Sequence, residues 1–600
     1  MTSSVFQFSP EDYEDQLESI IQELLDMETF DQASYESILR RHPKDGGGFF
    51  SKSDIIRGFR YLNRKLAWNL EERPFLERLR MKPVRTQSGV APVTVLTKPF
   101  PCPGRCIFCP SDVRMPKSYL SSEPGAQRAA QHQFDPFDQS FSRLRAYYNI
   151  GHQTDKVELI ILGGTWSSYP EPYQIWFAKR CFEALNSAGE EAMAGSWKPA
   201  SPAVDYRNLS STVDGRQIQK TYNQVVTDFL RHENASESDM DTAGWEDLIA
   251  EQQANEHAET RCVGLVLETR PDHLTLEEVV RMRRLGATKI QIGYQSLSDR
   301  VLELNHRGHD VATTRRAMHL LRQAGFKIHA HWMPNLYGST PTGDIEDFER
   351  IFADPDFRPD ELKIYPCSLI ESAELMRYYE SGEWRPYSQT ELLQVVTECM
   401  LLTPEYCRLT RVVRDIPGTD IVDGSRVTNL REVAEDELSA RGVRGRDIRS
   451  REIRHRRVDP EELELKQQSY RSSLGREVFL QYVTPTNRIA AFLRLSLPLE
   501  SVPIPEIHES AMIREVHVYG LLASIGQRQG VRSQHLGLGR KLIEEAARRA
   551  AAEGYPDLAV ISAIGTRAYY RNNGFTDGEL YQHRALQRRS DLGRCRDEVA

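Results

Sequence analysis

The sequence lacks three features that would place it in a simple class. No apolar run reaches about 18 residues, and the acidic start has no basic segment followed by an apolar one, so we expect neither a membrane anchor nor a signal peptide. Cysteine is scarce, with nine in 600 residues, too few for a disulfide scaffold. Basic residues are not in excess, because the formal net charge is −9. These absences predict a soluble, cytoplasmic protein in which local basic clusters make any contact with a polynucleotide.

The composition is that of a globular chain with several domains. Six hundred residues with 40% hydrophobic content exceed what one core needs, so two or three domains are expected. Within a first region at 1–85, residues 9 to about 80 show helical periodicity without strand-like alternation. Residues 54–87 contain nine Lys or Arg against four Asp or Glu. We therefore expect the chain to begin with a helical basic region.

Between residues 86 and 385, short β-rich runs alternate with helical segments. The six runs are VTVLTKPF, VELIILGG, CVGLVLETR, KIQIGYQS, KIHAHWMP and ELKIYPC. This α/β alternation predicts a parallel sheet that forms an incomplete (β/α)6-type barrel. Between the second and third runs, residues of about 190–245 are predicted to form an acidic, partly disordered surface insertion. The neighbouring stretch 232–259 has nine Asp or Glu and no Lys or Arg.

The last two segments differ in charge and in pattern. Residues 386–470 are expected to form a basic linker, in which residues 441–457 hold eight Arg against Asp447 and Glu452. This density favours binding of RNA phosphates, and a solvated linker helix is the alternative. Residues 471–600 combine hairpin-like strands, a glycine loop, a long helix and a further strand, which predicts a separate α+β domain.

Three of the nine cysteines fall within eight positions. Cys102, Cys106 and Cys109 follow the first expected strand with the spacing C-x3-C-x2-C. Three thiolates on one loop can ligate three irons of a 4Fe-4S cluster and leave the fourth iron open to the amino and carboxylate groups of S-adenosylmethionine (SAM). A structural zinc takes four protein ligands, and a fourth Cys or His is not apparent nearby, so zinc and unligated thiols are the weaker alternatives.

Residues at the ends of the later runs are further candidates for cofactor binding. Gly163, Gly164 and Thr165 follow the second run, where glycine allows a ligand to approach the backbone. Glu268 and Arg270 lie at the end of the third run, and Gln295 and Ser296 lie at the end of the fourth. We expect all four to line the mouth of the barrel. A tight turn and ordinary capping of strand ends are the structural alternatives.

A second glycine pattern lies in the C-terminal segment. Gln534, Gly537 and Gly539 lead directly into an amphipathic helix at 540–552. Backbone N–H groups at such a helix start converge and the dipole favours an anion, which indicates binding of the pyrophosphate of coenzyme A. Tyr569 and Tyr570 follow the next strand and are candidates for a phenol that acts near a thioester; packing in a small core is the alternative.

Together these motifs resemble one protein family. A radical SAM domain followed by a GNAT-type acetyltransferase domain is similar to the catalytic subunit of Elongator and its bacterial and archaeal single-chain relatives. The matching blocks between residues 50 and 582 are KPVRTQSGV, EPGAQRA, DKVELIILGGTW, CVGLVLETRPD, GYQSLSDRVLELNHRGHD, HWMPNL, RDIPGTDIVDG and REVHVYG.

The resemblance implies a reaction, its cofactors and its partner. A SAM-derived radical would abstract hydrogen from the methyl group of acetyl-CoA, the carbon radical would add to C5 of the wobble uridine of tRNA, and hydrolysis would leave a carboxymethyl group. The implied enzyme is an acyltransferase, a tRNA carboxymethyluridine synthase, that uses a 4Fe-4S cluster, SAM and acetyl-CoA. The tRNA anticodon stem-loop would be the partner, and the N-terminal region would be one of the regions that contact it. A second copy of the chain or accessory subunits are possible further partners.

The resemblance also assigns residues to acetyl-CoA. Lys156 would contact it from the radical SAM side, as a third candidate for catalysis. The GNAT side would use Tyr570, the backbone of Glu515, Val516, His517 and Val518, and the loop Leu538, Gly539 and Arg540. Relatives often carry a group of cysteines where this chain has GRDIRSRE at 445–452, which puts a structural zinc in doubt.

Two other functions stay open. A protein lysine acetyltransferase would use the GNAT fold but would leave the cysteine cluster and the Arg-rich segment without a purpose. A non-catalytic tRNA-binding scaffold would leave LGGTW and QHLGLG unexplained.

Overall fold

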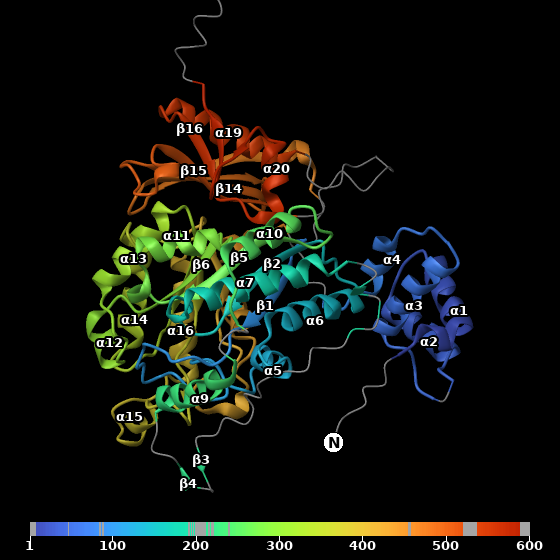
Figure 1. The fold of residues 1–600 in the computed structure, drawn as a ribbon, viewed down its shortest axis with the longest axis horizontal. Helices are drawn as coiled ribbons and strands as arrows, with labels where there is room; N and C mark the ends of the chain where they lie inside the picture. Colours follow the sequence, from blue (N-terminus) through green and yellow to red (C-terminus); the bar gives the residue numbers. More distant parts are fainter. Residues whose placement is uncertain are drawn as a thin grey trace, which may run out of the picture.

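Three units follow one another along the chain in the computed structural model (Figure 1). A helical N-terminal unit stands to one side, a half-barrel domain forms the body, and a C-terminal domain stacks on one end of the half-barrel. The structure describes residues 8–587 except for 46, 83–85, 87–88, 190–191, 194, 196, 198–211, 214–215, 218–220, 238–240, 454–457 and 520–536.

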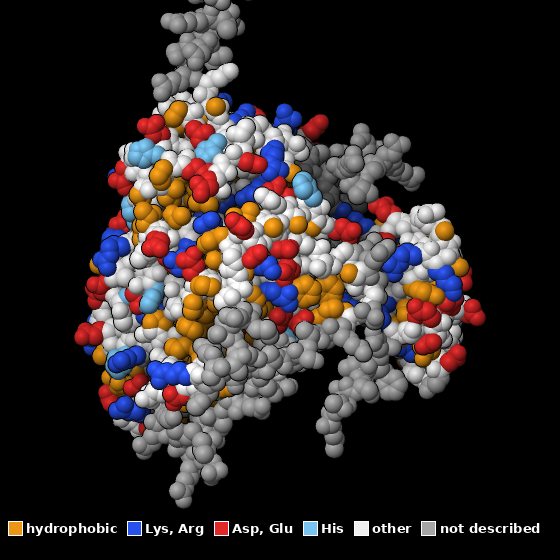
Figure 2. All heavy atoms as spheres, in the orientation of Figure 1, with side chains coloured by type: hydrophobic (Ala, Val, Ile, Leu, Met, Phe, Trp, Pro, Cys, Tyr) orange, Lys and Arg blue, Asp and Glu red, His pale blue; other side chains and the backbone are white. Residues whose placement is uncertain are grey.

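The N-terminal unit is helical, as predicted. Its elements are η1 (Pro10–Tyr13), α1 (Glu14–Asp26), α2 (Gln32–Arg41), α3 (Lys52–Lys65) and α4 (Glu72–Leu79). Their apolar faces enclose a small core of their own, which includes Leu17, Ile21 and Phe59. Arg60 ties the unit to the next domain by donating a hydrogen bond to the Tyr148 carbonyl at 2.6 Å. Figure 2 shows acidic and basic side chains mixed on the visible face of this unit, and its contact with tRNA stays a prediction.

A seven-stranded parallel sheet forms the half-barrel domain. Its strands lie in the order β1 (Ala91–Leu96), β2 (Lys156–Leu162), β5 (Arg261–Thr269), β6 (Lys289–Gln295), β7 (Lys327–Trp332), β8 (Glu361–Ile364) and β10 (Arg408–Arg411). All neighbours pair in parallel. The six expected strands are confirmed. The seventh, β10, escapes prediction because its sequence, RLTR, contains no apolar run.

Helices cover the outer face of this sheet (Figure 1). The longest are α6 (Pro136–Asn149), α7 (Glu171–Asn186), α13 (Val311–Gln323), α14 (Pro341–Ala353) and α16 (Gln389–Leu402). Shorter elements of the domain are α5 (Pro124–Gln131), α11 (Leu276–Arg284), α12 (Asp299–Leu304), β9 (Leu369–Ile370), α15 (Met376–Glu380), β11 (Ile421–Asp423), α17 (Leu430–Ala440) and α18 (Ile448–Arg451). The strands point apolar residues such as Leu159, Ile290 and Ile328 into the main core, and all three are 0% exposed. The outer face of the sheet is therefore buried under the helices.

The acidic insertion is partly folded onto the half-barrel. Its described part contains β3 (Thr212–Val213), β4 (Arg216–Gln217) and α9 (Tyr222–Glu237), and α10 (Trp245–Asn255) follows. Tyr222 and Val226 of α9 are buried in one cluster with Leu96 and Met115. The apolar face of α9 therefore packs on the loop after β1, so this part of the insertion is ordered against the half-barrel.

The C-terminal domain is an α+β sheet. Its strands lie in the order β12 (Glu464–Arg471), β13 (Gly475–Val483), β14 (Ile489–Pro498), β15 (Ser510–Val518), β16 (Asp557–Val560), β18 (Gln582–Ala585) and β17 (Thr576–Asp577). The pair β15 and β16 is parallel, with α19 (Leu538–Ala552) between them in the chain, and the other neighbours are antiparallel. This order agrees with the predicted acetyltransferase-like fold. Across the described parts of the chain, no helix is long and apolar enough to cross a membrane.

The segment 386–470 is built into both domains, which corrects its expected role as a basic linker. It supplies α16 and β10 to the half-barrel and begins β12 of the C-terminal sheet. Arg451 is 5% exposed and donates hydrogen bonds to Gln481 Oε1 and to the Glu405 carbonyl, both at 2.9 Å. Because its guanidinium is used inside the protein, Arg451 is not available to RNA phosphates. Arg454 and Arg456 lie outside the described residues.

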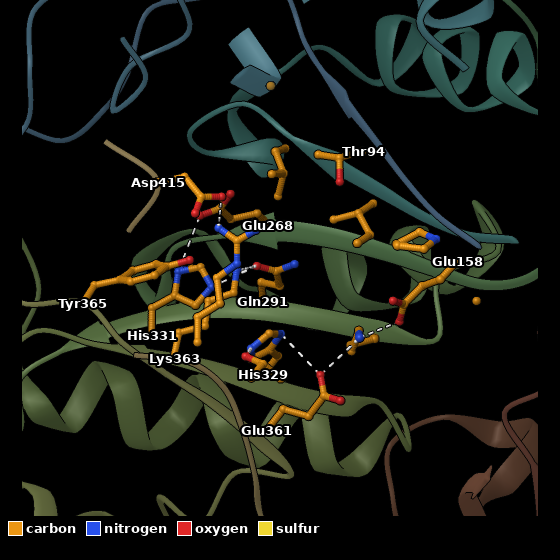
Figure 3. A pocket seen from close by; sticks show the side chains of 18 of the residues that line it. Thr94, Glu158, Glu268, Gln291, His329, His331, Glu361, Lys363, Tyr365 and Asp415 are labelled. Carbon is orange, nitrogen blue, oxygen red and sulfur yellow. Dashed lines mark hydrogen bonds and ion pairs between the residues drawn. The ribbon is translucent and has the colours of Figure 1, made fainter. Parts of the chain in front are cut away.

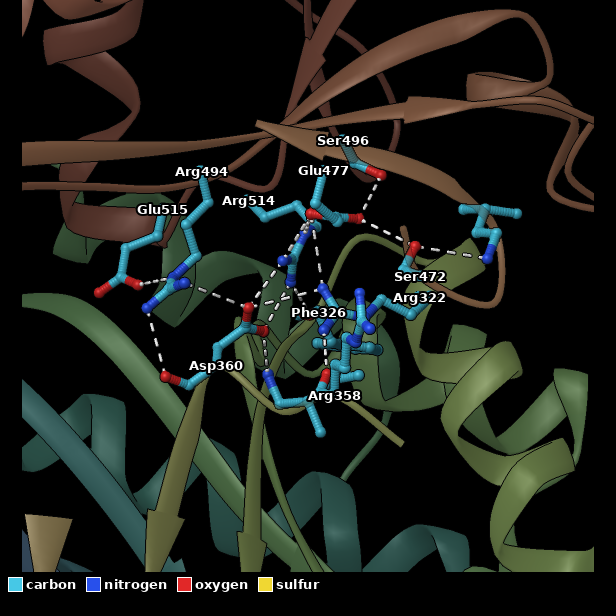
Figure 4. Close-up of polar contacts among 12 residues, drawn as sticks. Arg322, Phe326, Arg358, Asp360, Ser472, Glu477, Arg494, Ser496, Arg514 and Glu515 are labelled. Atoms are coloured by element: carbon cyan, nitrogen blue, oxygen red, sulfur yellow. Dashed lines mark hydrogen bonds and ion pairs between the residues drawn. The ribbon is translucent and has the colours of Figure 1, made fainter. Parts of the chain in front are cut away.

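A buried network of opposite charges joins the half-barrel to the C-terminal domain (Figure 4). Asp360, directly before β8, is 0% exposed and accepts two hydrogen bonds from Arg514 of β15, each 2.7 Å long. Arg514 also donates to Glu477 of β13 at 2.8 Å. Burial alone would raise the pKa of Asp360, but Arg322, Arg514 and Arg494 hold it well below its usual range. The carboxylate is therefore ionised and paired, and it fixes the two domains relative to each other.

The same network continues along the domain boundary to strand β15. Arg494 of β14 donates to Glu515 of β15 at 2.8 Å. Lys327 of β7 pairs with Glu515 and also, at 2.8 Å, with Glu361 of β8. Lys289 of β6 lies 3.1 Å from the same Glu361 carboxylate. A chain of ion pairs thus links β15 to β7, and through Glu361 to β8 and β6 of the half-barrel.

Candidate active site

The three predicted cluster ligands lie on the loop between β1 and α5. Cys106 is 8% exposed, whereas Cys102 and Cys109 are partly exposed. The backbone N–H and carbonyl of Cys102 bind the side chain of Asn223 in α9 at 2.9 and 2.7 Å. Cys109 Sγ lies 3.2 Å from Ser118 Oγ. The loop is therefore held by contacts from its own chain segment and from the insertion.

Cys106 lies in a strongly cationic environment. Arg307 Nη1 and Arg270 Nη1 lie 3.4 and 3.6 Å from its sulfur. A hydrogen bond with Cys109, followed by the charges of the two arginines, holds the pKa of the Cys106 thiol well below its ordinary value. The hydrogen bond with Cys106, followed by burial, raises the pKa of the Cys109 thiol. Cys106 is thus prepared as a thiolate, which is the form that binds metal.

The three thiols fit an iron–sulfur cluster. In a 4Fe-4S cluster each thiolate can ligate a different iron, and this loop carries three cysteines. Wherever the structure describes side chains, no three His, Cys, Asp or Glu converge closely enough to hold one metal ion. The guanidinium groups beside Cys106 favour the anionic sulfur that an iron binds.

The predicted glycine motif lies beside this loop at the carboxyl end of β2. Gly163 has φ +146°, and a Cβ there would lie 1.7 Å from Thr97 Oγ1, so a side chain does not fit. Gly164 has φ +86°, and its missing Cβ would face the Lys117 carbonyl of the cysteine loop at 3.4 Å. Thr165 is 3% exposed directly behind them. The structure therefore brings this motif and the cysteines together.

A cavity of about 1040 Å³ runs through the interior of the half-barrel. At the cysteine loop it is lined by Cys109, Glu268 and Gln295. The side-chain oxygen of Gln295 is buried and has no hydrogen-bond partner, and Glu268 accepts a hydrogen bond from Tyr119 at 3.0 Å. At the other end the cavity is lined by residues of the C-terminal domain, which include Glu515, Val516, His517 and Tyr570. One cavity thus connects residues predicted to bind SAM with residues predicted to bind acetyl-CoA.

The middle of the cavity is lined by basic groups that stand close together (Figure 3). Lys363 of β8 and His331 of β7 both contact the side-chain oxygen of Gln291 in β6, the histidine at 2.9 Å. Burial lowers the pKa of Lys363 to about 7 and holds that of His331 well below its ordinary value. Burial has the same effect on His329, which lies one inward position before His331 in β7. Burial therefore reduces the positive charge that these amine and imidazole groups carry in the centre of the cavity.

Sequence reasoning missed these residues, although a signal for them exists. The inward residues of KIHAHW are Lys327, His329 and His331, and they alternate with apolar residues that point into the core. A parallel strand with helices on its other side is normally apolar on both faces. Polar residues at every second position in β7 therefore indicate a strand whose inner face lines a polar cavity.

Strand β15 has an unpaired edge where acetyl-CoA is predicted to bind. Strand β16 pairs with residues 510–513 of β15 and no further, whereas β14 pairs with β15 as far as Val518. Among the residues that the structure describes, no strand therefore pairs with the second edge of Glu515, Val516, His517 and Val518. An extended ligand with amide groups can bind such an edge as an additional strand does.

The start of α19 lies next to the predicted tyrosines. Gly537 has φ +68° and leads into the first turn, which contains Leu538, Gly539 and Arg540. A Cβ on Gly539 would lie 2.5 Å from the Tyr569 hydroxyl, so glycine allows this ring to approach the helix. Tyr570 is 7% exposed and lines the cavity, whereas Tyr569 is 43% exposed and does not. Gln534 lies outside the described residues.

Lys156 stands at the domain boundary and not in the cavity wall. It opens β2, at the end of the sheet opposite the cysteine loop, and its register partner is Arg261. A Cβ on Gly565 of the C-terminal domain would lie 2.6 Å from the Arg261 side chain, so the two domains pack closely there. Lys156 Nζ lies 3.7 Å from the Asp155 carboxylate. The structure thus places Lys156 near the C-terminal domain but does not join it to Tyr570.

The sequence matches two family models. The Radical SAM superfamily matches residues 238–351, and the Radical_SAM C-terminal domain matches residues 359–440. These segments include strands β5 to β10 of the half-barrel.

Similar proteins and a solved structure cover most of the chain. A tRNA uridine(34) acetyltransferase of Methanocaldococcus infernus is 35% identical over 95% of this chain and 98% of its own length. The human Elongator complex protein 3 is 33% identical over 83% of this chain and 85% of its own length. The structure of the Methanocaldococcus infernus Elp3 with an N-terminal deletion covers 83% of this chain and 100% of its own, with 33% identity and a TM-score of 0.64. The chain therefore belongs to the family of the tRNA uridine(34) acetyltransferases and Elongator complex protein 3.

Proposed function

We propose that this protein is a tRNA carboxymethyluridine synthase that uses SAM, a 4Fe-4S cluster and acetyl-CoA to modify C5 of the wobble uridine. The names of its relatives support uridine 34 of tRNA as the substrate and an acyl donor as co-substrate. The match to the Radical SAM superfamily supports the cluster and SAM. The names of the relatives do not state the chemical group that is added, so the carboxymethyl product is our own proposal.

One observation carries the proposal, namely a cavity that extends from the cysteine loop of the half-barrel to the C-terminal domain. It reaches from Cys109 and Gln295 at one end to His517 and Tyr570 at the other. A radical generated on SAM is too reactive to cross water, so donor and acceptor groups must share one enclosed space. A lysine acetyltransferase would not need a passage from its thioester site to a cysteine loop.

Each end of the cavity has a defined task in this reaction. The open edge of β15 would bind the pantetheine amides of acetyl-CoA, and the N–H groups at the start of α19 would bind its phosphates. Tyr570 would donate a hydrogen bond near the thioester, because burial raises the pKa of its hydroxyl and keeps it protonated. When bound, the cluster and SAM supply the carbon radical that abstracts hydrogen. The cavity wall would hold the acyl group and the uracil together and exclude bulk water.

The test uses the full chain, reconstituted anaerobically with iron and sulfide. It is incubated with tRNA, SAM, a reductant and acetyl-CoA labelled with carbon-13 in both acetyl carbons, and the wobble nucleosides are analysed by mass spectrometry. We expect uridine to gain a carboxymethyl group that contains both labelled carbons. Label on protein lysines with none on tRNA would favour an acetyltransferase, and unmodified tRNA that stays bound would favour a scaffold.

Variants assign the parts of the reaction. The triple variant Cys102→Ala, Cys106→Ala, Cys109→Ala should lose both iron and product. Tyr570→Phe and Lys156→Ala should lower product formation with iron content unchanged. Tyr569→Phe is the matched control for Tyr570→Phe, because its ring lies outside the cavity wall. Equal losses in both tyrosine variants would contradict the role of Tyr570.

A further inference from the structure

Arg270 is a buried residue outside the cysteine loop whose guanidinium contacts the Cys106 sulfur. Its Nη1 lies 3.6 Å from Sγ, and the side chain is 5% exposed. Asp272 fixes the other side of the guanidinium, with Nε and Nη2 donating to its two carboxylate oxygens at 2.9 and 2.8 Å. Nη2 also donates to the Arg307 carbonyl. The guanidinium is thus aimed at the sulfur by fixed partners.

The backbone of the cysteine loop is shaped to admit this side chain. A Cβ on Gly104 would lie 2.2 Å from Arg270 Nη1, a distance that no real contact allows. The backbone of Gly104 is not left-handed, so the fold does not require glycine there for conformational reasons. Glycine at this position therefore serves the approach of Arg270 to Cys106.

The groups that surround the three cysteine sulfurs differ. Cys106 Sγ faces the guanidinium groups of Arg270 and Arg307, whereas Cys109 Sγ faces the neutral hydroxyl of Ser118. Asn223 binds the backbone of Cys102, not its sulfur. Guanidinium N–H groups are therefore directed at the sulfur of one ligand of the proposed cluster.

We propose that Arg270, aimed by Asp272 and admitted by Gly104, is a positioning residue that raises the reduction potential of the iron–sulfur cluster through the Cys106 sulfur. Hydrogen bonds to ligand sulfurs and the local net charge set the potential of such clusters. Reduction adds negative charge, and a buried guanidinium stabilises that charge more than water-exposed groups do. The inference rests on the cluster required by the proposed function but not on the reaction with tRNA.

The test measures the potential directly, without tRNA or acetyl-CoA. Reconstituted full-length protein is titrated with reductant at controlled potential, and the reduced cluster is quantified by electron paramagnetic resonance. Arg270→Gln should lower the ratio of reduced to oxidised cluster at a fixed potential by about tenfold, which is about 59 mV for a one-electron couple. Iron content should stay at the wild-type level.

Two further variants separate contact from charge. Gly104→Ala displaces the guanidinium from the sulfur but keeps its charge beside Asp272, so we expect a smaller loss in the same direction, about threefold. Arg105→Gln removes a charge from the same loop at an exposed position and is the control, with an expected change below about twofold because water screens it. If Arg270→Gln fails to assemble a cluster, Gly104→Ala decides the question.

The outcomes distinguish this inference from the proposed function. Unchanged potentials in Gly104→Ala, or a shift in Arg105→Gln as large as that in Arg270→Gln, would overturn the role of Arg270 while leaving the tRNA reaction untouched. Wild-type protein that binds no cluster at all would overturn the proposed function itself.

Discussion

The charges around Asp360 and the charges in the cavity belong to the same strands of the half-barrel, yet they are balanced differently. Asp360 is fully buried between Arg514 and further arginines, so each charge has an opposite partner. Lys363, three residues later in the chain, binds the amide oxygen of Gln291 instead of a carboxylate. Burial consequently lowers the pKa of Lys363 to about 7.

This difference in pairing distinguishes charged groups that stabilise the fold from groups that can take part in a reaction. A buried ion pair with complete hydrogen bonding holds its groups in one protonation state and one position. A buried amine without a carboxylate partner can change its protonation state near neutral pH. The boundary network therefore fixes geometry, whereas Lys363 can gain or lose a proton near neutral pH.

The largest effect is expected from breaking the boundary network. Asp360→Asn would leave Arg514 and its neighbours buried without an anion and should lower the free energy of unfolding by about 3–5 kcal/mol. Guanidinium unfolding of the full chain measures the change. A loss below about 1 kcal/mol would mean that the network is not what holds the domains together.

A substitution in the cavity should change the free energy of unfolding in the opposite direction. Lys363→Met removes a buried amine and should raise the free energy of unfolding by about 1–4 kcal/mol at pH 7. The folded pKa of about 7 lies below the ordinary value of 10.5, so the unfolded chain binds more protons between these pH values and wild-type stability gains with rising pH. The advantage of Lys363→Met should therefore be largest below pH 7 and should shrink toward pH 10.5. An advantage that does not depend on pH would contradict the lowered pKa.

A half-buried pair in the C-terminal domain should give an intermediate effect. His583 binds Asp557 at 2.8 Å and Glu506 at 3.3 Å, and hydrogen bonds to Asp557 and then to Glu506 raise the pKa of His583 to about 9. Because the folded pKa is raised, this stabilisation is complete below about pH 6.5 and is lost as pH rises through 9. His583→Gln should lower stability by about 1–2 kcal/mol at pH 6 and by much less at pH 10, as thermal unfolding at the two pH values would reveal.

The smallest effect is expected at the surface. Arg315 pairs with Asp356, and their side chains are 41% and 30% exposed. Asp356→Asn should change the free energy of unfolding by less than about 1 kcal/mol, and added salt should reduce even that. This variant is the control for Asp360→Asn, because both remove one carboxylate charge paired with arginine. Equal losses in the two would show that burial does not set the effect.

The sequence predicts best what is local. The cysteine loop and the six strands follow from spacing and apolar runs, whereas β10 and the cavity groups depend on which residues face inward once seven strands are paired. The open edge of β15 is invisible in the sequence, because it depends on where β16 stops pairing. The density of arginines in the sequence predicts that Arg451 binds phosphate, but the sequence does not reveal that its side chain is buried.

The contact between Asn223 and Cys102 joins two segments that are synthesised at different times. The two residues are 121 positions apart, so all three thiols leave the ribosome well before the side chain that holds the backbone of Cys102. Because Cys102 and Cys109 are partly exposed while α9 is docked, the contact fixes the position of the first thiol without covering it.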